Sequence, residues 1–266
     1  MNYLYDGSFD GFLTCVYRHY YGERAAGIFP ANDYHQLDML SYAMTVETDG
    51  KLAARVLGAI EEKLSKWDAE RVRQVFCTNE PEKEMKLLRY LQLGFKRGSS
   101  IRLLHGNPIV KDVEAAEQRL FREVHRLTGL IRFSELEGGV LYSPIEPDND
   151  VLEFLAPHFS DRYRYDPFVI HDKVRGKALF AYDKKWRVEA FDGEMLSPSR
   201  GEYGAAVNEE DEGAGRPIRV SENEESYRRL WKQYFEVMAT KERVNPKLQR
   251  QFVPVRYRKH LPEFEP

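Results

Sequence analysis

The sequence predicts an α+β protein, in which an antiparallel sheet packs against helices and a mostly helical N-terminal lobe precedes that sheet. Three observations support this class. Apolar residues recur at three- and four-residue steps through most of the first hundred residues, as they do on the buried face of a helix. Residues 131–145 alternate around a Gly138-Gly139 turn, as in a β-hairpin. Three short strand-like segments then follow as a meander.

The N-terminal lobe is expected to cover residues 1–105. A short strand over Asn2–Asp6 leads into a helix that Ser8 caps and Gly22 ends, because serine accepts hydrogen bonds from the first free backbone amides. A second strand is expected over Ala43–Thr48 and a helix over Lys51–Trp67, with Leu52, Val56, Ile60 and Leu64 buried. Two more helices are expected at about residues 70–77 and 81–95.

Residues 106–266 are expected to form the second domain, after a glycine-rich boundary between Gly94 and Pro108. Its first helix buries apolar residues from Val113 to Leu127, and the hairpin follows. A helix from Asn149 or Asp150 should be interrupted at Pro157, because proline lacks the amide that a helix interior uses. The meander strands are expected at residues 168–171, 178–182 and 186–191. A glycine-rich acidic surface loop is expected at 201–215, and a helix with buried aromatic residues at 223–239.

Composition excludes several classes of protein. The formal net charge of -3 argues against a globally basic nucleic-acid binder but leaves room for local basic patches. Two cysteines cannot form a disulfide scaffold, a cysteine-rich zinc site or an iron–sulfur cluster within this chain. No signal peptide or membrane span is evident, which predicts a cytoplasmic protein with no membrane partner. The common nucleotide-binding, zinc-protease, redox and esterase motifs are also missing.

Polar residues that could perform acid–base chemistry gather in the central stretch of the sequence. Imidazoles, carboxylates and guanidinium groups of this kind serve in general acid–base catalysis when they meet in one cleft. The candidate catalytic residues are His125, Arg132, His158, Asp161, Arg162, His171 and Asp172. No two of these histidines have a recognised ligand spacing, so neither a metal site nor a cofactor is assigned. Pro147-Asp148 with Asp183-Lys184-Lys185 weakly resembles a nuclease pattern, although its second half falls in an expected turn.

Two basic segments are candidates for nucleic-acid contact. Arg119, Arg122 and Arg126 form one stripe along a helix, although a solvated helix face is the favoured explanation, because exposed arginines are common. The segment Lys241–His260 holds seven basic residues against one acid, with aromatic rings between them. Its candidate contacts are Arg250, Arg256, Tyr257 and Arg258. A basic tail that packs over an acidic surface is the alternative.

Six segments resemble one bacterial protein family: YLYDGSFDGFL, LRYLQLGF, HRLTGLIRFSEL, EPDNDVLEFLAPHFSDRY, IHDKVRGKALFAYD and NPKLQRQFVPVRYRKHLPE. The family is uncharacterised, is described as DNA-metabolism proteins, and contains a domain of unknown function. The resemblance implies a gene neighbour that is a radical-SAM protein of DNA modification or repair. Some relatives are fused to a uracil-DNA-glycosylase-like domain, but this chain shows no glycosylase motif. The resemblance brings no established catalytic residues.

Three functions therefore stand as hypotheses. The preferred one is an accessory protein of DNA modification or repair that contacts DNA and partners a radical-SAM enzyme. The second is a metal-dependent hydrolase or nuclease that uses the histidine, aspartate and arginine cluster. The third is a non-catalytic adaptor whose charged residues form salt bridges.

Overall fold

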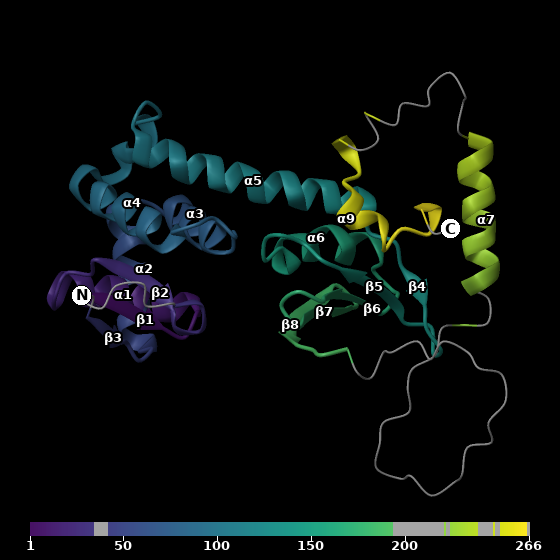
Figure 1. The fold of residues 1–266 in the computed structure, drawn as a ribbon, viewed down its shortest axis with the longest axis horizontal. Coiled ribbons are helices and arrows are strands. Elements are labelled where there is room, and N and C mark those ends of the chain that lie inside the picture. The colour runs from purple at the N-terminus through teal and green to yellow at the C-terminus, as the bar shows by residue number, and fades with distance from the viewer. Residues whose placement is uncertain (35–41, 194–220, 222–223, 239–246, 248–250, 265–266) are drawn as a thin grey trace, which may run out of the picture. The chain divides into compact units, whose positions relative to one another are not determined.

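The structure is a computed structural model that describes residues 1–34, 42–193, 221, 224–238, 247 and 251–264 (Figure 1). The chain divides into two units, unit 1 at Met1–Arg122 and unit 2 at Glu123–Pro266. The division falls within the helix α5, Pro108–Leu130, so each unit contains part of this helix. Over the described ranges, each unit consists of helices and one sheet, so the predicted α+β class is confirmed.

Unit 1 contains a small parallel sheet in the strand order β2-β1-β3. Its strands are β1 (Asn2–Tyr5), β2 (Gly27–Pro30) and β3 (Ala43–Thr45). The helices are α1 (Phe9–Tyr21), α2 (Gly50–Lys63), α3 (Lys66–Phe76) and α4 (Lys83–Arg97), and short 3-10 turns lie at Ala31–Asp33 and Gly98–Leu103. The sequence analysis found β1 and β3 but missed β2, which is four residues long and ends in proline.

Serine caps explain where two of these helices begin. The Ser8 hydroxyl accepts a hydrogen bond from the Gly11 amide at 2.9 Å, and Gly22 follows the last residue of α1, as predicted. The single helix expected over Lys51–Trp67 is wrong at its C-terminal end. The Ser65 hydroxyl accepts the Asp68 amide at 3.0 Å, which starts α3 and separates it from α2.

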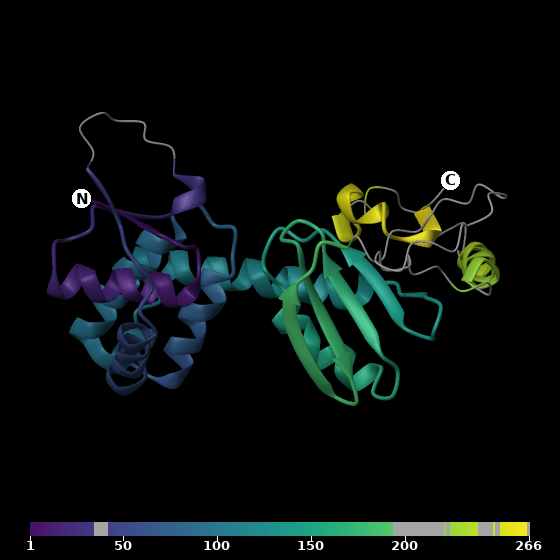
Figure 2. The ribbon, with the colours of Figure 1, turned by 90° about the horizontal axis from the view of Figure 1, so that it is seen from below.

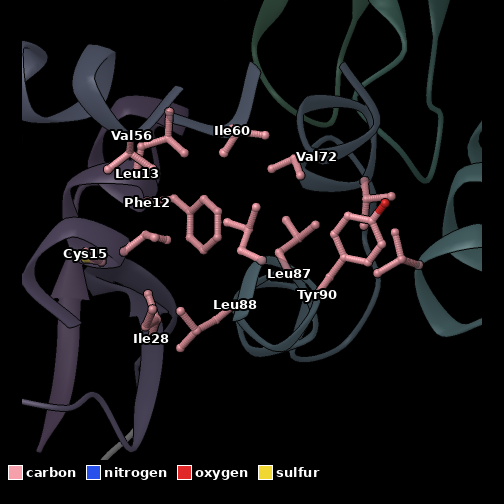
Figure 3. Packing of buried hydrophobic residues seen from close by; sticks show 14 of the residues in the cluster. Phe12, Leu13, Cys15, Ile28, Val56, Ile60, Val72, Leu87, Leu88 and Tyr90 are labelled. Carbon is pink, nitrogen blue, oxygen red and sulfur yellow. The ribbon is translucent and has the colours of Figure 1, made fainter. Parts of the chain in front are cut away.

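The core of unit 1 lies where α1, α2, α3 and α4 meet, and Figure 3 shows its central side chains. Phe12 from α1, Ile60 from α2 and Leu87 from α4 are fully buried there. Two buried tyrosines keep their hydroxyl groups paired: Tyr5 donates to Glu84 at 2.8 Å and Tyr90 donates to Asp68 at 2.9 Å. These pairings satisfy polar atoms that would otherwise be costly to bury.

Unit 2 contains a five-stranded sheet in the order β4-β5-β6-β7-β8. Its strands are β4 (Ser134–Glu135), β5 (Leu141–Ile145), β6 (Phe168–Asp172), β7 (Lys177–Tyr182) and β8 (Lys185–Ala190). The predicted hairpin and meander are present, and most neighbouring strands are antiparallel. The exception is β5 with β6, which pair in parallel because α6 (Leu152–Arg162) connects them as a crossover.

The helix α6 covers one face of this sheet and lies behind the strands in Figure 2. Its Phe159 ring is 5.6 Å from Phe133 and 6.4 Å from Phe168, in edge-on contacts that build the core on this side. The predicted interruption at Pro157 is wrong. Pro157 lies on the exposed side of α6, where the carbonyl that loses its helical partner can bind water instead.

The C-terminal part of unit 2 consists of α7 (Glu224–Met238), α9 (Val255–Arg258) and a 3-10 turn at Pro262–Phe264. The prediction that α7 buries Tyr227, Leu230 and Tyr234 is wrong, because all three are exposed. The Trp231 indole of this helix donates to Glu263 at 3.0 Å. The loop expected over 201–215 lies outside the described residues.

Candidate nucleic-acid interface

Side chains alternate between the two faces of the unit 2 sheet. Phe168 and Ile170 of β6 point toward α6, so Val169 and His171 point to the opposite face, called here the outer face. The strand register places Phe180 beside Val169 and Arg187 beside Phe180 on this same face. The outer face therefore brings together residues from three strands.

A groove crosses the outer face near one end of the strands and encloses about 580 Å³. Phe180 and Tyr182 supply aromatic rings, while Lys185 and Arg187 supply cations. Tyr182 is 62% exposed, and the Arg187 guanidinium lies 5.8 Å from the centre of the Phe180 ring. The other lining residues are Val140, Pro167, Phe168, Val169, Ala181 and Trp186. This combination of flat rings and cations on an accessible sheet is suited to stacking bases and binding phosphates.

The charges around the groove favour an anionic partner. Lys184 adds a third cation at the β7–β8 turn, next to Asp183, and both residues have positive φ, 62° and 49°. A lysine is costly in that left-handed conformation, which glycine or asparagine adopts more easily. Arg187 contacts Glu189 at 3.2 Å, but both side chains are largely exposed, so this pair is weak and can open.

His171 lies on the outer face beneath the end of β8 and is buried, with 3% of its surface exposed. Its Nδ1 atom is 2.8 Å from the Tyr142 hydroxyl, and its ring packs edge-on against Phe191 at 4.9 Å. Gly193 closes this pocket at a φ of +77°, and a Cβ atom there would lie 2.6 Å from the imidazole. Burial raises the pKa of Tyr142 to about 12 and lowers that of His171, so it favours the neutral form of both groups.

The buried imidazole gives the protein an expected dependence of stability on pH. Burial, assisted by Lys173, holds the pKa of His171 below its usual value of 6.5. As the pH falls through 6.5, the unfolded chain binds a proton that the folded ring does not bind, so the free energy of unfolding decreases. The decrease is at most about 1.4 kcal/mol per pH unit for this group.

Urea unfolding between about pH 7.5 and about pH 5.5 measures this effect. The variant His171→Gln is expected to lose less stability over that interval than the unaltered protein. The remaining loss includes His19 and His260, whose pKa values burial also lowers. An identical pH dependence in the variant would contradict the assignment.

The other candidate catalytic residues lie apart from His171. Asp172 is the next residue in β6 and points to the opposite face, where it pairs with Arg175 at 2.9 Å and accepts the Val174 amide at 3.0 Å. His158 is exposed on α6, also on the opposite side of the sheet, and contacts Phe159. Within the described parts of the chain, no three His, Cys, Asp or Glu residues are grouped so that they could hold a metal ion.

The remaining members of this set have separate surroundings. His125 is exposed on α5, and Asp161 and Arg162 are exposed at the C-terminal end of α6. Arg132 pairs with Glu263 at 3.0 Å, and its guanidinium lies 5.2 Å from the centre of the Trp231 ring. Arg132 therefore helps to fasten the C-terminal segment, together with α7.

The predicted arginine stripe on α5 is present, with different contacts at each position. Arg119 forms an ion pair with Glu80. Arg122 is exposed and donates to the Gln118 carbonyl at 3.1 Å, and Arg126 is half-buried. The exposed charge of this stripe is smaller than three arginines suggest, because a carboxylate already offsets one of them.

The predicted tail contacts are engaged within unit 2. Tyr257 is buried and its hydroxyl donates to Glu123 at 2.5 Å, so its ring is not presented for base stacking. Arg256 forms an ion pair with Asp148 and lies 3.7 Å from Glu123. Arg258 donates to the Val253 carbonyl at 3.2 Å. Arg250 lies outside the described residues.

The residues of the outer-face groove were missed as binding candidates in the sequence analysis. The signal was present in the hairpin sequence FAYDKKWR, where Phe180, Tyr182, Lys185 and Arg187 fall on one face once the two-residue turn is recognised. The turn itself was predicted, but the side of the sheet covered by α6 follows only from the parallel crossover.

Fold and groove define an α+β protein whose sheet is covered by a helix on one face and carries aromatic and basic residues on the other. Residues 81–263 match the model of the family described as a domain of unknown function, DUF4130, and the chain belongs to this family. No match was found among curated proteins. Among the described residues, none of the helices is long and apolar enough to cross a membrane.

Proposed function

We propose that the protein binds single-stranded nucleic acid through the outer-face groove, as an accessory protein of DNA modification or repair. The observation that carries the proposal is the groove itself, in which Phe180 and Tyr182 of β7 lie beside Arg187 and Lys185 of β8. Bases stack on such rings without regard to sequence, and phosphates pair with such cations. The likeness of the sequence to DNA-metabolism proteins supports DNA as the nucleic acid, and supports a radical-SAM enzyme as the partner that performs the chemistry.

Fluorescence-anisotropy titration with single- and double-stranded DNA at two salt concentrations tests the proposal. Single-stranded DNA is expected to bind more tightly, with an affinity that falls as salt increases, because phosphate contacts release counterions. Tyr182→Leu should weaken binding about tenfold by removing a stacking ring. Replacing both Lys185 and Arg187 with glutamine should lower the salt slope by about 0.7 for each phosphate contact that is lost.

Two controls locate the interface. Lys111→Gln removes one exposed cation from unit 1 and should leave binding unchanged. A variant with glutamine at Arg256 and Arg258 tests the tail, and loss of binding in that variant alone would move the interface to the tail. No binding to either DNA at low salt would contradict the proposal and favour the adaptor. Co-purification with a radical-SAM protein of the kind that the family resemblance implies tests the partnership separately.

A further inference from the structure

Unit 1 contains a separate cavity between α1, α2 and α4, with a volume of about 280 Å³. It reaches the surface, and no acidic residue lines it. The lining residues are Val16, Tyr17, Tyr20, Tyr21, Arg55, Val56, Ala59, Lys63 and Phe95. Four of these nine side chains are aromatic and two are cations.

The aromatic rings form two contacting pairs at the mouth of the cavity. Tyr17 stacks on Tyr21 with ring centres 4.6 Å apart and planes 28° apart. Tyr20 meets Phe95 edge-on at 5.8 Å. Tyr20 is 45% exposed and Tyr21 is 71% exposed, so substantial ring surface remains accessible. Accessible rings held by their neighbours offer stacking area with little loss of side-chain freedom.

Both cations of the cavity lie over these rings. The Arg55 guanidinium is 5.5 Å from the Tyr17 ring centre and 5.7 Å from that of Tyr21. The Lys63 ammonium is 5.8 Å from the Phe95 ring centre. No carboxylate is among the described residues that line the cavity.

Two arginines elsewhere in unit 1 are paired with carboxylates, by contrast. Arg71 pairs with Glu117 at 3.0 Å, and Arg119 pairs with Glu80. The positive charge at the cavity is therefore available to a ligand. An anion that entered here would meet two cations and no competing carboxylate from the lining.

We propose that this cavity binds a nucleobase together with its phosphate. The base stacks on the exposed tyrosines, and the phosphate pairs with Arg55 and Lys63. The volume is close to the lower end of the range for small-molecule sites, roughly 300–1,000 Å³, which suits a ligand of mononucleotide size. Either a free mononucleotide or one nucleotide of a single strand provides this chemistry.

This site does not depend on the groove in unit 2. Its nine lining residues belong to unit 1, and none of them lines the groove. The two sites are therefore tested with different variants of the same full-length chain. A negative result at the groove does not contradict the proposal for the cavity, and a negative result at the cavity does not contradict the proposal for the groove.

Isothermal titration calorimetry with deoxyadenosine monophosphate, deoxyadenosine and a short oligodeoxyadenylate provides the test. The mononucleotide is expected to saturate one site, and the nucleoside, which lacks the phosphate, should bind at least about tenfold more weakly. If the oligonucleotide binds more tightly at the cavity than the mononucleotide, the natural ligand is a strand. If it binds equally or more weakly, the ligand is a free nucleotide. Absence of binding by both phosphate-bearing ligands would overturn the proposal.

Three variants assign binding to the cavity. Tyr20→Leu should weaken mononucleotide binding about tenfold through lost stacking, and replacing Arg55 and Lys63 with glutamine should abolish the preference for the phosphate. Ala59→Leu keeps both cations and fills the space, so it should also block binding. Lys111→Gln, outside both sites, should bind mononucleotide normally. Urea unfolding confirms that each variant is folded. Unchanged binding in all three cavity variants would refute the site.

Discussion

Replacing Glu123 with alanine is expected to lower the free energy of unfolding by about 3–5 kcal/mol, as when one partner of a buried charged network is removed. This carboxylate is buried and accepts the amides of Asp148 and Asn149, each at 2.9 Å, and the Asn149 side-chain amide at 2.6 Å. It also accepts the Tyr257 hydroxyl at 2.5 Å. Four donors, three of them from buried residues, would lose their acceptor at once, and each unsatisfied buried group costs free energy.

Urea unfolding followed by circular dichroism measures the loss. Tyr257→Phe removes a single donor and should cost about 1–2 kcal/mol, a fraction of the Glu123 effect. Glu137→Ala, at an exposed turn, is the matched control and should change stability by less than about 0.5 kcal/mol. A Glu123→Ala loss no larger than that of the control would show that water replaces the carboxylate without penalty.

Leu87→Ala is expected to cost about 3–5 kcal/mol, because the side chain is 0% exposed in the centre of the unit 1 core. The substitution removes apolar contacts and leaves a cavity that the surrounding helices fill incompletely. Leu103→Ala provides an unusually direct control, since it makes the same chemical change at a leucine that is 79% exposed. Thermal and urea unfolding should separate the two variants by at least about 2 kcal/mol. Similar losses would mean that burial does not set the effect.

Local signals in the sequence predicted much of the fold. The turn signals and helical periodicity located β1, α1, the hairpin and the meander, because capping and alternation are properties of neighbouring residues. The parallel pairing of β1 with β2 and of β5 with β6 was not predicted, since it depends on contacts between distant segments. The burial of α7 was inferred from its periodicity, but a periodic apolar face is buried only where another element covers it.

The candidate sites were harder to predict than the fold. His171 and Asp172 are adjacent in the sequence and were both predicted as catalytic residues of one cleft, yet strand alternation directs them to opposite faces. Basic residues in the tail looked available for DNA, but Arg256 and Lys259 have acidic partners more than a hundred residues earlier in the chain. The sequence shows which residues are charged, whereas the ion pairs that neutralise them depend on the tertiary structure.

The boundary of the family match and the boundary of the fold do not coincide. The match begins at residue 81, whereas α4 contributes Leu87, Leu88 and Leu91 to a core that includes Phe12 and Ile60 from before residue 81. A fragment of this chain cut at residue 81 would expose those leucines and be prone to aggregation. The region that matches the family model therefore does not form an independent folding unit in this protein. Gene fusion or exchange that preserves solubility must carry the preceding helices along with it.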